Sequence, residues 1–119
     1  MEIVLREKTE NDNPWIIESL RNNWGSDFII SRGVKHYPTK LDGCIIENNG
    51  RVIGICLYSI VRKSCEIVLI EVYERRKGIG AELLTKIIKK GKQEKWKRIW
   101  LITTNDNIDA LKFYLKNGF

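Results

Sequence analysis

The feature that most constrains this chain is a change in the spacing of its apolar residues at Gly78. Before it, residues 65–72 form a mostly apolar run of strand length. After it, apolar residues recur at the spacing of one helix face: Ile79, Leu83, Leu84, Ile87 and Ile88. The sequence therefore predicts a strand that runs through a basic, glycine-containing turn into an amphipathic helix.

Signals on both sides of this junction predict further elements. Strand candidates are residues 2–6, 44–47, 51–61, 65–72 and 98–104. Asn49-Gly50 predicts a tight hairpin turn, and a second turn is expected near residues 62–64. We expect residues 26–40 to form a loop or irregular strand over a site. The order of elements predicts an α+β or α/β sheet packed by helices.

Two further helices are expected, one near each end of the chain. The first has Asn13 as a candidate cap and Pro14 at its first position, and it ends at Gly25. The last begins near Asp106 and ends at Gly118. Periodicity predicts that three tryptophans pack inside the protein, namely Trp15, Trp24 and Trp100.

The length and composition limit the class of protein. With 119 residues, 43% of them apolar, the chain has the size of one globular domain, residues 1–119. No apolar run approaches the roughly 20 residues of a membrane span, and the N-terminus does not look like a secretory signal, so we expect a cytoplasmic protein. Cys44, Cys56 and Cys65 lie in apolar runs without a CxxC pair, which predicts buried reduced thiols and no metal site.

Positive charge is concentrated in residues 75–98. That segment has ten Lys or Arg residues against Glu82 and Glu94, whereas the whole chain has a net charge of +6. Such a segment favours a polyanionic partner, either a phosphorylated small molecule or nucleic acid. The alternative is an ordinary solvated helix face.

The turn itself has the chemistry of a phosphate site. Gly78 and Gly80 allow a close approach of the backbone, and the first amides of the helix, from Gly78 to Ala81, would face a bound anion. Arg75, Arg76 and Lys77 add charge where the helix dipole already favours an anion. A dinucleotide fingerprint is excluded because Leu83 replaces its third glycine, and no P-loop sequence is present.

Two segments together resemble the GCN5-related N-acetyltransferases, the GNAT superfamily. Residues 75–80, RRKGIG, resemble the family's acyl-CoA pyrophosphate loop. Residues 107–119, with Asn107, Ala110, Tyr114 and Gly118-Phe119, resemble its second signature. The resemblance covers most of the chain, and segment 26–40 matches the family least. It implies a mixed, mostly antiparallel central sheet flanked by helices in three layers.

The resemblance also implies a reaction and the residues that carry it. An amine acceptor would attack the thioester of acetyl-CoA directly, without a metal. Glu66 is the first choice for the general base and Glu71 is the second. The alternative is that both are edge or solvent-face carboxylates without a catalytic role. Tyr114 would protonate the leaving thiolate. The acyl-CoA site would comprise Ile70, Val72, Arg75, Arg76, Lys77, Gly78, Ile79, Gly80, Ala81, Asn107, Ala110 and Tyr114. Arg32 and His36 are candidates for acceptor binding.

Departures from the family pattern leave two other functions open. Val72 stands where many members have proline, Arg76 where many have glycine, and the sequence stops where members usually continue into another strand pair. We therefore expect a C-terminally truncated domain and a homodimer that shields the exposed sheet edge. One alternative is a regulatory domain that binds CoA but is catalytically silent. The other is a basic nucleic-acid-binding module, which is less favoured because no nucleic-acid-binding signature is present.

Overall fold

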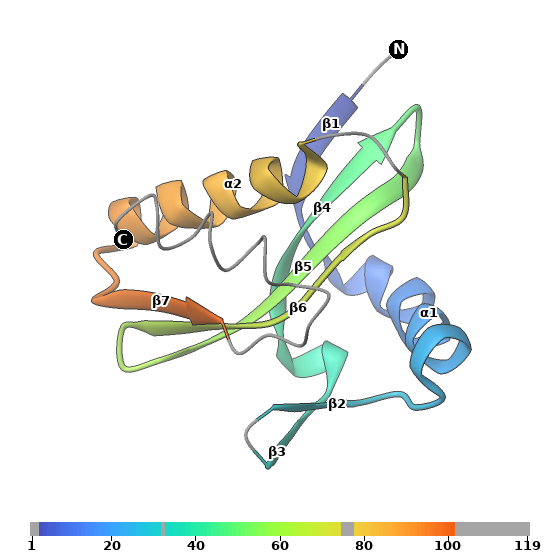
Figure 1. The fold of residues 1–119 in the computed structure, drawn as a ribbon, viewed down its shortest axis with the longest axis horizontal. Coiled ribbons are helices and arrows are strands. Elements are labelled where there is room, and N and C mark those ends of the chain that lie inside the picture. The colour runs from blue at the N-terminus through green and yellow to red at the C-terminus, as the bar shows by residue number, and fades with distance from the viewer. Residues whose placement is uncertain (1–2, 32, 75–77, 102–119) are drawn as a thin grey trace.

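The computed structural model describes residues 3–31, 33–74 and 78–101 (Figure 1). Its elements in chain order are β1 (Ile3–Glu7), η1 (Glu10–Asp12), α1 (Asn13–Trp24), β2 (Ile29–Ser31), β3 (Val34–His36), η2 (Pro38–Lys40), β4 (Asp42–Asn48), β5 (Arg51–Val61), β6 (Ser64–Val72), α2 (Ile79–Glu94) and β7 (Arg98–Leu101). The last helix expected from the sequence and the end of the strand before it lie outside these residues.

The main sheet has the order β1-β4-β5-β6-β7. Neighbouring strands are antiparallel except β6 and β7, which run parallel because α2 connects them. A separate two-stranded sheet pairs β2 with β3. This confirms the expected mixed, mostly antiparallel sheet with helices beside it.

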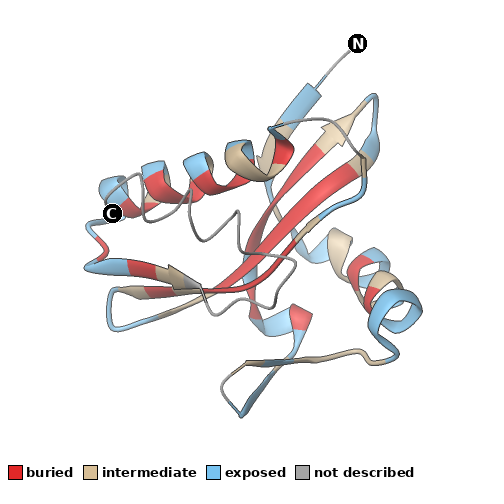
Figure 2. Cartoon of the chain, in the orientation of Figure 1, coloured by how far each residue is buried: buried red, intermediate tan, exposed pale blue. Residues whose placement is uncertain are grey.

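Helices α1 and α2 cover different sides of the main sheet, each over its own core (Figures 1 and 2). We call the side under α2 the α2 face; its core includes Leu83, Leu84 and Ile87 of the helix. We call the other side the α1 face; its core includes Ile16 and Leu20 of α1, with Ile29 of β2 packed against it. Segment 26–40 is thus a short hairpin and a turn on the α1 face.

The tight turns match their sequence signals. Asn49 and Gly50 both have positive φ, 51° and 82°, as the predicted hairpin turn requires. The β5–β6 turn has the same form, with Arg62 at 51° and Lys63 at 65°, although neither residue is glycine or asparagine. Gly25 ends α1 in the left-handed conformation, at φ 72°.

The structure corrects two details of α1. The N-cap position is Asp12, one residue before the expected Asn13, and Asp12 forms an ion pair of 2.8 Å with Arg6 of β1. Trp15 and Trp24 are 42% and 56% exposed, so the prediction that they are buried is wrong. They lie on the flanks of the buried stripe formed by Ile16 and Leu20, and periodicity alone resolves the edge of such a stripe poorly.

A glycine lets α2 approach the sheet. A Cβ atom at Gly54 of β5 would lie 2.8 Å from Ile46 Cγ2 and 3.0 Å from Ile79 Cγ2, closer than side chains tolerate. The contact with Ile79 lies at the first residue of α2. Gly54 therefore helps to set the height of the helix N-terminus above the sheet.

The three cysteines are free and buried, as the sequence predicted. Cys44 and Cys56 are cross-strand partners on the α2 face, and burial raises the pKa of the Cys65 thiol to about 12. Within the described ranges, no three His, Cys, Asp or Glu side chains are grouped to hold a metal ion. None of the described helices has the length and apolar character needed to cross a membrane.

Candidate acyl-CoA and acceptor site

The junction between β6 and α2 begins at Gly78. Its φ of 93° makes it a left-handed N-cap, which explains glycine at this position, and its carbonyl accepts the first helical hydrogen bond from Glu82 N at 2.9 Å. The amides of Ile79, Gly80 and Ala81 precede that bond and have no partner within the helix. Such a helix start can bind an anion, so the predicted phosphate site is compatible with this geometry.

The space at this helix start is open on the side of the glycines. A Cβ atom at Gly80 would meet only Val72 Cγ2, at 3.9 Å, among the described residues. Gly80 is therefore not required by packing, in contrast to Gly54. An open space beside free amides fits a phosphate group. Arg75, Arg76 and Lys77, expected to add charge here, lie outside the described residues.

Next to this junction, the described residues of β7 pair with the first half of β6. The parallel pairing runs from Ser64↔Arg98 to Ile67↔Leu101, whereas β5 pairs with β6 as far as Val72. Among the described residues, the edge of β6 beyond Ile67 thus has a strand partner on one side only. Ile70 and Val72, two predicted cofactor-binding residues, lie on this stretch. An extended ligand could pair with such an edge as an added strand.

A β-bulge at Val68 brings Glu66 and Glu71 to the same face. Leu57 pairs with Leu69 and Tyr58 with Ile67, so Val68 is an extra residue in β6. Residues five apart on a regular strand point to opposite faces. The bulge resets this alternation, and both carboxylates lie on the α1 face. No pattern in the sequence identifies the bulge.

Glu66 is bound to the small hairpin. Its Oε2 accepts a short hydrogen bond from the hydroxyl of Ser31, in β2. His36, predicted to bind the acceptor, lies in β3 opposite Ile29. Its Nε2 is buried and has no hydrogen-bond partner among the described residues. The hairpin thus brings polar groups to the side of the sheet where Glu66 lies. Arg32, the other predicted acceptor residue, lies outside the described residues.

Glu71 is held between two aromatic side chains. Trp24 Nε1 donates to its Oε2 at 3.0 Å, and the Tyr73 hydroxyl donates to its Oε1 at 2.9 Å. Tyr73 also contacts Trp15 edge to face, with ring centroids 5.6 Å apart, and burial raises the pKa of its hydroxyl. The sequence did not indicate Trp24 and Tyr73 as site residues. Trp24 is 47 residues from Glu71 and reaches it only through the tertiary structure, whereas Tyr73 lies two residues after Glu71, a spacing that could have indicated it.

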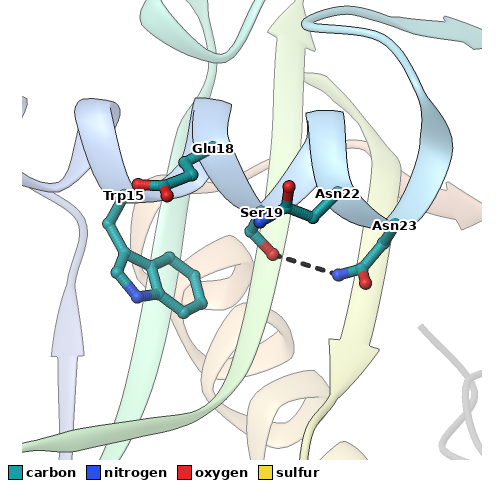
Figure 3. A pocket seen from close by; sticks show the side chains of 5 residues that line it. All are labelled: Trp15, Glu18, Ser19, Asn22 and Asn23. Atoms are coloured by element: carbon teal, nitrogen blue, oxygen red, sulfur yellow. Dashed lines mark hydrogen bonds between the residues drawn. The ribbon is translucent and has the colours of Figure 1, made fainter.

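A hollow of about 300 Å³ lies along α1 near this group (Figure 3). Its lining residues are Trp15, Glu18, Ser19, Asn22 and Asn23. Asn23 donates to Ser19 Oγ at 3.2 Å across the floor of the hollow. Trp15, which lines the hollow, contacts Tyr73 and so connects the hollow to the aromatic group around Glu71.

Three predicted site residues belong to the C-terminal signature. Asn107, Ala110 and Tyr114 lie outside the described residues, so their roles in cofactor binding and acid catalysis stay predictions. The described site therefore consists of the helix start, the open edge of β6, and the two carboxylates on the α1 face.

The described site thus joins the parallel β6–β7 pair to a glycine-containing helix start. The profile of the Acetyltransferase (GNAT) family matches residues 6–119, and the chain belongs to this family. It is 39% identical over 99 residues to the uncharacterized protein YdhI of Bacillus subtilis (strain 168), a match that covers 82% of this chain and 61% of YdhI. The uncharacterized protein YxbD of the same strain is 37% identical over 101 residues, covering 83% and 63%. The chain thus spans less than two thirds of the length of these relatives.

A solved structure has the same fold. The PaiA N-acetyltransferase from Thermoplasma acidophilum in complex with coenzyme A has a TM-score of 0.72 and 21% identity, covering 100% of this chain and 90% of its own. At that identity the likeness establishes the fold alone.

Proposed function

We propose that the chain is the N-acetyltransferase domain of an enzyme that transfers the acetyl group of acetyl-CoA to a primary amine. The acceptor attacks the thioester directly while both substrates are bound. The observation that supports this most, among the described residues, is the edge of β6 beyond Ile67 next to the amides of Ile79, Gly80 and Ala81, which have no partner within the helix. It combines an anion site with a slot for an extended chain.

In this proposal the described residues bind acetyl-CoA mainly through the backbone. The amides of α2 hold the pyrophosphate, assisted by Arg75, Arg76 and Lys77. The edge of β6 at Ile70 and Val72 pairs with the pantetheine arm. The open space at Gly80 fits this assignment, and the coenzyme A bound in the PaiA relative supports it. Acetyl-CoA supplies the activated acyl group.

The proposed proton transfers use one carboxylate and one tyrosine. Glu66 accepts a proton from the acceptor amine, directly or through water, with Glu71 as the second candidate. Tyr114 donates a proton to the departing thiolate. Asn107 and Ala110 complete the cofactor site. The acceptor class stays open among small amines, amino acids, peptide N-termini and protein lysines.

The decisive experiment measures acetyl transfer. A panel of these amines is incubated with the protein and acetyl-CoA, and the release of free CoA is followed. Tyr114→Phe keeps the ring and removes the hydroxyl, so turnover should fall about 10²-fold with unchanged CoA affinity. A protein that binds CoA but releases none with any amine would support the silent regulatory domain instead. Binding of a random oligonucleotide without CoA binding would support the nucleic-acid module.

A further inference from the structure

We infer that Glu71, Trp24 and Tyr73 form a subsite for an ammonium group of the acceptor, so that the acceptor is an organic cation with at least one charged amine. We call these three residues the aromatic–carboxylate subsite. The inference deepens the proposed function. It rests on that function only in identifying the bound amine as the acceptor of the acetyl group.

The negative charge of the subsite is fixed in position, and no cation among the described residues pairs with it. Both oxygens of Glu71 accept hydrogen bonds from neutral donors, Trp24 Nε1 and the Tyr73 hydroxyl. No Lys or Arg within the described ranges forms an ion pair with this carboxylate. Glu47 and Asp12, also on the protein's surface, are by contrast paired with Arg6. A carboxylate held by two neutral donors retains a full charge for a ligand.

The rings around this carboxylate are unusually accessible. Trp24 is 56% exposed and Tyr73 is 38% exposed, and Trp15, in contact with Tyr73, is 42% exposed. Large aromatic side chains that gather at a surface mark binding sites more often than they stabilise a monomer. The faces of Trp and Tyr rings attract ammonium groups, and a nearby carboxylate adds to this attraction. The charge and the rings together select a cation.

The hollow along α1 gives such a ligand room to extend. It is lined by Trp15, whose ring contacts Tyr73 of the subsite, and by Ser19 (Figure 3). Its lining adds the Glu18 carboxylate and the amides of Asn22 and Asn23. A volume of about 300 Å³ exceeds that of a single water and accommodates a short alkyl chain with a polar end. An elongated amine can therefore contact the subsite and the hollow together.

The alternative is that Trp24 and Tyr73 only fasten α1 to β6. Both interpretations predict destabilisation on mutation, so stability cannot separate them. Binding of a cation can. The Trp24 indole N–H, bonded to Glu71, is a direct reporter in a nitrogen–proton NMR spectrum, and Trp24→Phe assigns its resonance.

The test uses the protein without acetyl-CoA and three probes at constant ionic strength: 1,4-diaminobutane, n-butylamine and 1-butanol. Both amines should shift the Trp24 indole resonance in a saturable manner, and the neutral alcohol should not. Glu71→Gln keeps the shape and should weaken binding of 1,4-diaminobutane about five- to tenfold. Glu10→Gln, which removes an exposed carboxylate of η1, is the matched control and should leave binding unchanged.

A second variant keeps the inference falsifiable if Glu71→Gln perturbs the fold. Tyr73→Leu retains apolar bulk without the ring and should weaken binding several-fold. Equal shifts with 1-butanol, or unchanged affinity in folded Glu71→Gln and Tyr73→Leu proteins, would overturn the inference. These outcomes are independent of catalysis. Amine binding at Trp24 in a protein that does not bind CoA would leave the subsite standing while the proposed function fails.

Discussion

The two faces of the sheet are built by different means. On the α2 face, buried aliphatic side chains and a glycine bring the helix close to the strands, and the groups proposed to face the ligand are backbone amides at Gly78 to Ala81. On the α1 face, a smaller core leaves room for carboxylates and aromatic rings that reach the surface. In the proposed function, the face that binds acetyl-CoA uses backbone geometry, whereas the face that binds the acceptor amine uses side chains.

The largest effect is expected from Glu66→Gln on the α1 face. If Glu66 is the general base, turnover should fall by about 10²- to 10⁴-fold while CoA affinity is unchanged. The measurement is CoA release at saturating acetyl-CoA and acceptor. Glu71→Gln and Glu10→Gln are compared under the same conditions. Wild-type turnover in Glu66→Gln together with a strong loss in Glu71→Gln would reverse the assignment of the base.

On the α2 face, Gly80→Val should remove CoA binding without unfolding the protein. A side chain here would occupy the space assigned to the pyrophosphate, yet it meets no backbone atom of the described residues within 4 Å. Saturation at a hundred times Kd should stabilise the wild type by about 2.7 kcal/mol and the variant not at all. Thermal denaturation with and without CoA measures this difference. Thr85→Val, at an exposed position in the same helix, is the control, and a normal shift in Gly80→Val would refute the loop assignment.

Gly54→Ala should separate packing from binding on the α2 face. The added methyl group would lie 2.8 Å from Ile46 Cγ2 and 3.0 Å from Ile79 Cγ2, so the helix must move. We expect a loss of about 1–3 kcal/mol in the free energy of unfolding, measured with urea. Gly80→Ala, with its nearest neighbour at 3.9 Å, should lose none. Equal stabilities of the two variants would show that Gly54 does not set the position of α2.

The smallest effect concerns an ion pair on the α1 face. The Arg6 guanidinium lowers the pKa of Asp12 to about 2 from an ordinary value of 3.8. A lowered folded-state pKa stabilises the protein above the unfolded-state pKa, and this stabilisation is lost as the pH falls from about 4 to about 2. We expect Asp12→Asn to lose about 1–2 kcal/mol at pH 6 and little at pH 2.5.

Urea titrations of both proteins across this pH range provide the measurement. Asp27→Asn is the matched control, because its pair with Arg21 is 3.3 Å long and about half exposed. Its expected effect is below about 0.5 kcal/mol. A pH-independent difference between wild type and Asp12→Asn would mean that the helix-capping position of Asp12, rather than its charge, stabilises the start of α1.

Most of the fold could be predicted from local signals in the sequence. The turn at Asn49-Gly50, the end of α1 at Gly25 and the start of α2 at Gly78 all depend on positive φ angles that glycine or asparagine adopts at low cost. The helix face of Ile79, Leu83, Leu84 and Ile87 follows from period alone. These signals also located the helix start proposed to bind phosphate, because its donors are backbone amides whose placement depends on local conformation.

The α1 face was decided by tertiary structure. The bulge at Val68 places Glu66 and Glu71 on one face, against the alternation that their spacing predicts. Trp24 meets Glu71 only because α1 packs beside β6, whereas Tyr73 lies two residues after Glu71 in the chain. The sequence alone determined where the backbone turns and which segments are helices or strands, since these depend on near neighbours. The side-chain groupings depend on contacts between segments up to 47 residues apart, and no local pattern encodes them.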